Sequence, residues 1–109
     1  SKENPMVERE EIYSLGTYTF NFTNQHLKHK KFEKSLTRKE AALLRLLCIN
    51  KGKLMPREKA LISIWGDDDY FIGRSMDVFI SKLRKYLSHD PRISISNIHG
   101  AGFRLEVEE

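Results

Sequence analysis

The segment from Arg74 to Leu87, RSMDVFISKLRKYL, decides the fold expected for this chain. At 3.6 residues per turn its apolar residues share one stripe of a helix, namely Met76, Ile80, Leu83 and Leu87, with Phe79 and Tyr86 beside them. The opposite side carries cations, hydroxyl groups and one small apolar side chain: Arg74, Ser75, Val78, Ser81, Lys82 and Lys85. The pattern predicts a helix with one side on a protein core and the other side in solvent.

The composition of the polar side suits a helix that lies in a DNA major groove. Lysine and arginine side chains reach phosphates and guanine edges, and Val78 is small enough to meet a thymine methyl group. An ordinary amphipathic helix whose exposed side is basic is the alternative. This segment alone does not decide between the two, so the rest of the chain has to.

Size and composition predict one domain with one core, because the chain has 109 residues of which 39% are hydrophobic. The single cysteine, Cys48, stands in the apolar run AALLRLLC; it excludes an intrachain disulfide and fits a reducing, cytoplasmic environment. We see no membrane-length apolar run and no secretory leader. Residues 1–10 form a polar stretch that we expect to be a linker or tail, and residues 11–109 are expected to form the domain. We also expect a further domain upstream.

The positive charge of the chain is concentrated in patches. Lysine and arginine outnumber aspartate and glutamate by 19 to 15, a net charge of +4. Residues 28–34 hold four lysines against Glu33, and residues 74–87 hold four cations against Asp77. Such patches are expected in a protein with a polyanionic partner. For residues 28–34 we favour the simpler interpretation, a solvated loop.

The first third of the domain has the alternation of a small antiparallel sheet. Within residues 11–36, four short runs with alternating apolar residues are separated by Gly16 and by Thr23-Asn24-Gln25. Tyr18, Phe20 and Phe22 recur at every second position, which predicts an aromatic face laid on the helices.

Helix boundaries are marked in the middle of the chain. Thr37 and Glu40 have the spacing of a capping box, which predicts the start of a helix that ends near Gly52. After an extended link at Leu54-Met55, a second helix is expected from Pro56 or Arg57 to about Trp65. A loop bounded by glycines is expected over residues 66–73, before the helix described first.

The end of the chain predicts a hairpin. Ile93, Ile95 and Ile98 open a strand, the turn follows at residues 99–102, and residues 103–107 return. The complete order predicts an α+β fold, a winged helix-turn-helix with an N-terminal four-stranded antiparallel sheet, three helices and a C-terminal β-hairpin wing.

An enzyme is not indicated. The sequence has no glycine-rich phosphate loop followed by Lys-Ser/Thr, no metal-binding set of histidine and cysteine, and no nucleophile motif. Its four histidines are scattered, and His26 and His29 point to opposite faces if they lie on one strand. We therefore expect no catalytic residues, no metal and no cofactor.

Four ordered segments resemble the OmpR/PhoB family of response-regulator output domains. They are LTRKEAALLRLL, GKLMPREKALISIWG, RSMDVFISKLRKYL and IHGAGFRL, within a match from about Ile12 to Val107. The resemblance implies sequence-specific binding to double-stranded DNA and control of transcription in a two-component system. It also implies an upstream receiver domain, direct-repeat sites bound by head-to-tail dimers, and contact with RNA polymerase through the 66–73 loop.

The resemblance also implies roles for single residues. The groove-facing positions of the family helix are occupied by Arg74, Ser75, Val78, Ser81, Lys82 and Lys85. Trp65 matches a residue that approaches the phosphate backbone, with core packing as the alternative or an additional role. Arg84 is expected either to contact phosphate or to pair with Asp77, and Arg104 to contact phosphate or to have a structural role.

Three positions depart from the family pattern. Ser81 stands where a long cation is frequent, so base recognition is expected to depend on Arg74, Lys82 and Lys85. His99 stands where the wing often has an arginine directed into the minor groove, and an imidazole gives a weaker contact whose charge depends on pH. Phe79 stands where a histidine or tyrosine is frequent, so we expect packing there. A winged-helix module that binds proteins and has lost its DNA contacts is the alternative function, although we expect such helices to lose their cations.

Overall fold

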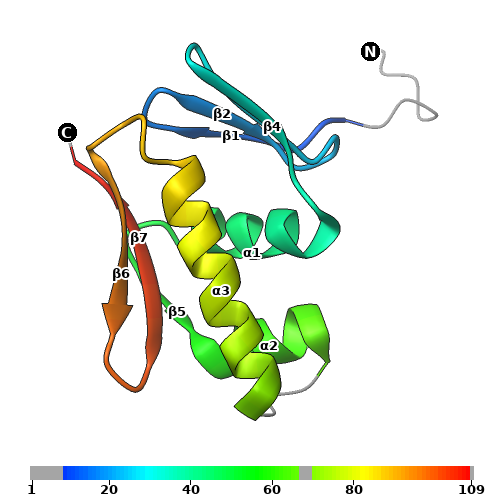
Figure 1. Cartoon of the computed structure of the whole chain (residues 1–109), viewed down its shortest axis with the longest axis vertical. Coiled ribbons are helices and arrows are strands. Elements are labelled where there is room, and N and C mark those ends of the chain that lie inside the picture. The colour runs from blue at the N-terminus through cyan, green and yellow to red at the C-terminus, as the bar shows by residue number, and fades with distance from the viewer. Residues whose placement is uncertain (1–8, 67–69, 109) are drawn as a thin grey trace.

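The computed structural model describes residues 9–66 and 70–108, apart from the side chains of residues 70–72. In chain order the elements are β1 (Ile12–Leu15), β2 (Tyr18–Asn21), β3 (His26–His29), β4 (Phe32–Ser35), α1 (Arg38–Ile49), β5 (Leu54–Pro56), α2 (Arg57–Trp65), α3 (Tyr70–Tyr86), β6 (Ile93–Ile98) and β7 (Gly102–Val107). Figure 1 shows the four-stranded sheet at one end, α1 below it, α2 at the opposite end, and the β6–β7 hairpin alongside α3. Among the described helices, none has the length and apolar character needed to cross a bilayer.

The N-terminal sheet is an antiparallel meander with strand order β1-β2-β3-β4, as predicted. Phe20 pairs with Tyr13 on one side and with Leu27 on the other, and Phe20 and Leu27 are fully buried. Tyr18 is also buried and Phe22 packs against the same core, so the predicted aromatic face is confirmed. Alternation along β2 thus turns one face of the sheet toward the helices.

The capping box at the start of α1 is present. The Thr37 hydroxyl accepts a hydrogen bond from the Glu40 backbone N–H (3.2 Å), and Glu40 Oε1 accepts one from the Thr37 N–H (2.9 Å). The other Glu40 oxygen, Oε2, accepts from the Tyr86 hydroxyl at 3.0 Å. The carboxylate of Glu40 is buried but satisfied by both contacts, so the cap also ties α1 to α3.

The extended link predicted at Leu54-Met55 is confirmed, and it lies in a strand, β5, whose pairing the sequence did not indicate. β5 pairs with β7, and the second sheet has the order β5-β7-β6. Gly102 in β7 has a φ of +157°, and a Cβ there would lie 2.1 Å from the Met55 carbonyl oxygen. Only glycine permits this close approach of the two backbones. Pro56 precedes the first residue of α2 as its N-cap, and Gly66 ends α2 in the left-handed conformation.

Helix α3 begins at Tyr70, so the prediction of a loop over the whole of residues 66–73 is wrong for residues 70–73. Residues 67–69 lie outside the described residues. Gly73 suggested a break, but a Cβ there would lie 3.0 Å from the Arg57 guanidinium nitrogen Nη2. The glycine therefore makes room for a packed side chain within the helix, where its intrinsic cost is only about 1 kcal/mol.

The apolar stripe of α3 lies in the core, as predicted. Met76, Ile80, Leu83 and Leu87 are each at most 2% exposed. They share one cluster with side chains from both sheets and from α1 and α2. The stripe is therefore the surface on which the two sheets and the other helices meet.

Two polar contacts fix the N-terminal sheet to the end of α3. The Tyr18 hydroxyl donates to the Tyr86 carbonyl oxygen (2.8 Å) and accepts from the His89 N–H (3.0 Å). Asp90 Oδ2 accepts from the backbone N–H of Thr17 (2.9 Å) and from its hydroxyl (3.0 Å). The Arg92 guanidinium also pairs with Asp90 at 2.9 Å. The bonds of Thr17 and Tyr18 join the N-terminal sheet to the end of α3 and the segment that follows it, and Arg92 holds Asp90 within that segment.

Truncation of the buried stripe should destabilise the fold. Leu83 has no exposed surface, so Leu83→Ala leaves a cavity and should lower the free energy of unfolding by about 2–5 kcal/mol. Val78→Ala, on the exposed side of the same helix, should change it by no more than about 0.5 kcal/mol. Urea titrations of both variants measure the difference, and a Leu83→Ala protein as stable as the parent would show that the helix faces are inverted.

The Asp90 contacts should make stability depend on pH. The Arg92 guanidinium, with further hydrogen bonds from Thr17, holds the pKa of the Asp90 carboxyl well below its usual range. A lowered pKa in the folded state stabilises the protein above the unfolded pKa of about 3.9, and this contribution is lost as the pH falls below it. The difference in free energy of unfolding between the parent and Asp90→Asn should therefore shrink between about pH 5 and pH 2. A difference that stays constant over this range would contradict the assignment.

Candidate nucleic-acid interface

One side of α3 is exposed from Arg74 to Lys85 and carries the residues that the sequence placed there. Val78 is 54% exposed, and the other five groove-facing positions are exposed as well: Arg74, Ser75, Ser81, Lys82 and Lys85. None of the three cations in this set is turned into the core or covered by the hairpin. We call these six residues the exposed arc of α3.

Arg57, at the start of α2, holds the N-terminal half of α3. Its Nη1 lies 2.8 Å from Asp77 Oδ1, and its Nη2 lies 3.2 Å from Asp77 Oδ2. Nη2 also donates to the Gly73 carbonyl oxygen at 2.8 Å. This fork fixes the two helices of the helix-turn-helix relative to each other, and it pairs the Asp77 carboxylate beside the exposed arc with a cation.

The structural role of Arg57 was missed by the sequence analysis. A cation at a helix N-terminus is unfavourable with respect to the helix dipole, so Arg57 at the first position of α2 was a signal of another partner. Which partner it has depends on the packing of α2 against α3, and no local pattern contains that information.

Arg84 joins α3 to the hairpin. Its Nε and Nη2 both donate to the Ile95 carbonyl oxygen of β6, at 3.0 and 2.7 Å. The predicted alternative of a pair with Asp77 is wrong, because Asp77 is held by Arg57. The observed contact gives Arg84 a structural role, and its contact with phosphate stays a prediction.

Trp65 and Phe79 pack against each other beside the exposed arc. Their ring centroids are 5.5 Å apart at an interplanar angle of 42°. Lys82 Nζ lies 5.7 Å from the centroid of Phe79, so the ring also supports a cation of the arc. The packing predicted for Phe79 and Trp65 is confirmed, and the approach of Trp65 to a phosphate stays a prediction.

The hairpin residues are not gathered onto the exposed arc. His99 is exposed in the β6–β7 turn, which lies at the same end of the molecule as the start of α3 (Figure 1). Arg104 lies between Leu54 and Ser96 in the sheet, and its neighbours Phe103 and Leu105 point into the core, so Arg104 faces away from it. Its Nε is 3.5 Å from Glu106 Oε2. DNA contacts of His99 and Arg104 stay predictions.

The sequence matches the family described as "Transcriptional regulatory protein, C terminal" over residues 31–105. The chain belongs to this family. It is 46% identical over 98 residues to the transcriptional regulatory protein RprY of Bacteroides fragilis, an alignment that covers 90% of this chain and 42% of RprY. The chain thus spans less than half the length of this relative.

Two solved structures are similar to this chain. The response regulator DrrB of Thermotoga maritima, an OmpR/PhoB homologue, has a TM-score of 0.71 and 30% identity, with 87% of this chain and 44% of DrrB covered. The DNA-binding domain of Klebsiella pneumoniae RstA, solved in complex with the RstA box, has a TM-score of 0.72 and 25% identity, with 88% of this chain and 97% of the RstA domain covered.

Membership in this family confirms three predictions from the sequence. The OmpR/PhoB resemblance and the winged helix-turn-helix fold are correct. The family is one of transcriptional regulators, so the prediction that the domain is not an enzyme is also confirmed.

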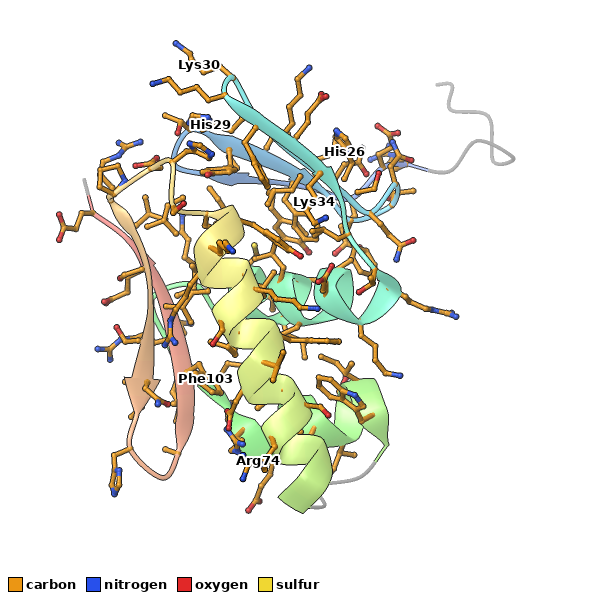
Figure 2. The ribbon with its side chains drawn as sticks, in the orientation of Figure 1. His26, His29, Lys30, Lys34, Arg74 and Phe103 are labelled. Atoms are coloured by element: carbon orange, nitrogen blue, oxygen red, sulfur yellow. The ribbon has the colours of Figure 1, made fainter. Side chains whose placement is uncertain are left out.

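The lysines of residues 28–34 lie far from the exposed arc. Figure 2 shows Lys30 at the β3–β4 turn and Arg74 at the opposite end of the molecule. Lys28 lies 3.8 Å from Glu33, and Lys34 Nζ lies 5.2 Å from the ring of Tyr86. The interpretation of residues 28–34 as a loop is wrong except at the β3–β4 turn, because Lys28 lies in β3 and Lys34 in β4. The exposure to solvent is confirmed for Lys28, Lys30 and Lys31.

The remaining candidate ligands do not form a site within the described residues. No group of three or more histidine, cysteine, aspartate or glutamate side chains is placed there to hold a metal. His26 pairs with Glu33 at 3.5 Å, whereas the buried His29 packs on Tyr18 with ring centroids 4.6 Å apart. Burial raises the pKa of the Cys48 thiol to about 12, so this group stays protonated and unreactive.

The contact of Arg84 with β6 predicts a stability effect. Arg84→Ala should lower the free energy of unfolding by about 1–3 kcal/mol, because the Ile95 carbonyl loses a charged donor. The neighbouring Lys85→Ala removes the same charge from the exposed arc and should change stability by no more than about 0.5 kcal/mol. Equal effects in thermal unfolding would mean that Arg84 does not hold the hairpin.

Proposed function

We propose that this domain binds double-stranded DNA in a sequence-specific manner through the exposed arc of α3, as the output domain of a two-component response regulator that controls transcription. The observation that carries the proposal is the position of Arg74, Lys82 and Lys85 on one solvent-facing side of a helix whose other side is core. Cations on a helix of this kind reach phosphates and guanine edges in the major groove. The likeness to the RstA domain, solved with its DNA box, supports the same mode of binding.

The wing extends the proposed interface. The β6–β7 turn and the start of α3 lie at one end of the molecule, so a duplex in contact with α3 passes close to this turn. We assign to exposed His99 a contact with the adjacent minor groove or backbone, and to Trp65, Arg84 and Arg104 contacts with phosphates. These four assignments rest on the family resemblance.

A protein-binding role without DNA contact is less well supported. A helix that has exchanged DNA for a protein partner has no need of an arc rich in cations, and this arc keeps them exposed. The pairing of Asp77 with Arg57 also removes the flanking negative charge that would oppose a polyanion.

The whole protein is proposed to contain more than this domain. The chain spans 42% of RprY and 44% of DrrB, which is described as a response regulator, and this supports a receiver domain upstream with residues 1–10 as a linker and residues 11–109 as the DNA-binding domain. We propose a cytoplasmic location, which a DNA-binding role supports. Direct-repeat sites, head-to-tail dimers and RNA polymerase contact through residues 66–73 are further proposals from the family, and residues 67–69 of that segment lie outside the described residues.

Binding to duplexes selected from a random pool tests the function. We expect a direct repeat spaced by about one helical turn, and a slope of log K against log salt of about −4 to −5 for about five neutralised phosphates. Arg74→Ala and Lys82→Ala should each weaken binding by about 1–3 kcal/mol without loss of the fold. Lys30→Ala removes the same charge at the opposite end of the molecule and should leave affinity unchanged.

Two results would contradict the proposal. One is the absence of any enriched sequence, which would leave only nonspecific attraction. The other is parental affinity in both Arg74→Ala and Lys82→Ala, which would move the interface away from α3.

A further inference from the structure

A pocket lies where the chain passes from α3 to β6 (Figure 1). Its volume is about 310 Å³, and its apolar lining residues are Leu87, Pro91, Ile93 and Ile95. Arg84 and two serines are among its polar lining residues. At about 30 Å³ for each water-sized group, this volume holds about ten non-hydrogen atoms. A mostly apolar pocket of this size with a few polar groups is typical of a site for a small molecule.

The Arg84 guanidinium lines the pocket with donors that the protein does not use. Its planar group carries five N–H bonds. Two of them, on Nε and Nη2, point to the Ile95 carbonyl oxygen at 3.0 and 2.7 Å. The N–H bonds that remain are on Nη1 and Nη2, and no acceptor among the described residues takes them. One from each nitrogen points the same way, so this second edge of Arg84 matches the two oxygens of a carboxylate.

The carboxylate that lines the same pocket is already paired. Asp90 is 4% exposed, and its oxygens accept hydrogen bonds from Arg92 at 2.9 Å and from the Thr17 hydroxyl at 3.0 Å. Its negative charge is therefore compensated within the protein, whereas the second edge of Arg84 keeps its charge and its donors for a ligand. The polar part of the pocket thus favours an anion.

We propose that this pocket binds a small carboxylate with an apolar body of up to about eight carbon atoms, the number that the volume permits beside two oxygens. The carboxylate accepts from the second edge of Arg84, and the apolar body lies against Leu87, Ile93 and Ile95. Such a ligand contacts α3 and β6 at the point where Arg84 already joins them, so it stabilises the attachment of the hairpin to the helix.

A titration of the 15N-labelled domain with sodium hexanoate near neutral pH tests this site by NMR. We expect saturable shifts at the amides of Leu87, Ile93 and Ile95, with a Kd of about 1–5 mM for a ligand of about eight non-hydrogen atoms. Hexan-1-ol has the same chain without the charge and should bind about tenfold more weakly, because it loses the charged hydrogen bonds.

Three variants separate the parts of the site. Arg84→Gln should weaken hexanoate about tenfold and leave hexan-1-ol within about twofold. Ile93→Ala removes apolar lining and should weaken both ligands by a similar factor, about fivefold. Lys85→Ala is the matched control, since it removes the neighbouring cation, which does not line the pocket, and should leave hexanoate affinity within about 1.5-fold.

Three outcomes overturn the inference. They are the absence of saturable shifts up to about 50 mM hexanoate, equal affinity for hexanoate and hexan-1-ol, and equal loss of hexanoate binding in Lys85→Ala and Arg84→Gln. Thermal unfolding checks that the variants are folded, and if Arg84→Gln is not, the comparison of the two ligands with the parent decides. The titration contains no DNA, so its result does not depend on the proposed function or on the phosphate contact assigned to Arg84.

Discussion

The burial of one stripe of α3 sets the position of every other element. Met76, Ile80 and Leu83 are at most 1% exposed and lie in one cluster with Phe20 of the N-terminal sheet and Phe103 of the wing. A rotation of the helix by one residue, about 100°, would move two of these side chains into water and bring Arg74 or Lys82 toward the core. The orientation of the exposed arc is therefore a consequence of core packing, and it requires no contact between the arc and the rest of the protein.

Polar contacts then hold α3 at three levels along its axis. Near its start, Arg57 donates to the Gly73 carbonyl; further along, Arg84 donates to the Ile95 carbonyl; at its end, Tyr18 donates to the Tyr86 carbonyl. Each acceptor is a backbone oxygen, whose position depends on the chain path and not on a rotamer. Recognition of a base edge needs side chains placed to within about 0.5 Å, and contacts at three levels along the axis restrain the helix against pivoting.

Local sequence patterns predicted those features whose causes are local. The stripe on α3, the Thr37–Glu40 capping box and the alternation of Tyr18 and Phe20 depend on residues a few positions apart, so periodicity and spacing were sufficient. The three-residue strand β5 forms because β7 supplies its partner, and Arg57 of α2 packs over Gly73 where α3 extends beyond its predicted start. These partners lie in elements distant in sequence, and the same is true of the acceptor of Arg84.

For the candidate site, the sequence predicted which side chains are exposed but not which of them have second partners. The arc follows from helix geometry, so all six of its residues were identified correctly as solvent-facing. Arg57 at the start of α2 and Arg84 in the last turn of α3 show the limit of this reasoning. Arg57 was given no role and Arg84 was given two alternatives, because a guanidinium reaches far enough to choose among several acceptors.

The pattern of long and short side chains on the arc has a mechanical consequence for the proposed complex. Around the helix, Val78 lies between Lys85 and Lys82, and the serines at positions 75 and 81 lie at the two edges of the arc, so the short residues leave gaps through which the backbone can approach the bases. The cations on either side then bend outward to phosphates without holding the helix away from the groove floor. A lysine at position 78 would abolish this arrangement even though it adds a positive charge, because its side chain would occupy the gap. Affinity from charge and specificity from close approach are thus separate properties of the same surface, and Val78 lies where the second depends on a small apolar residue.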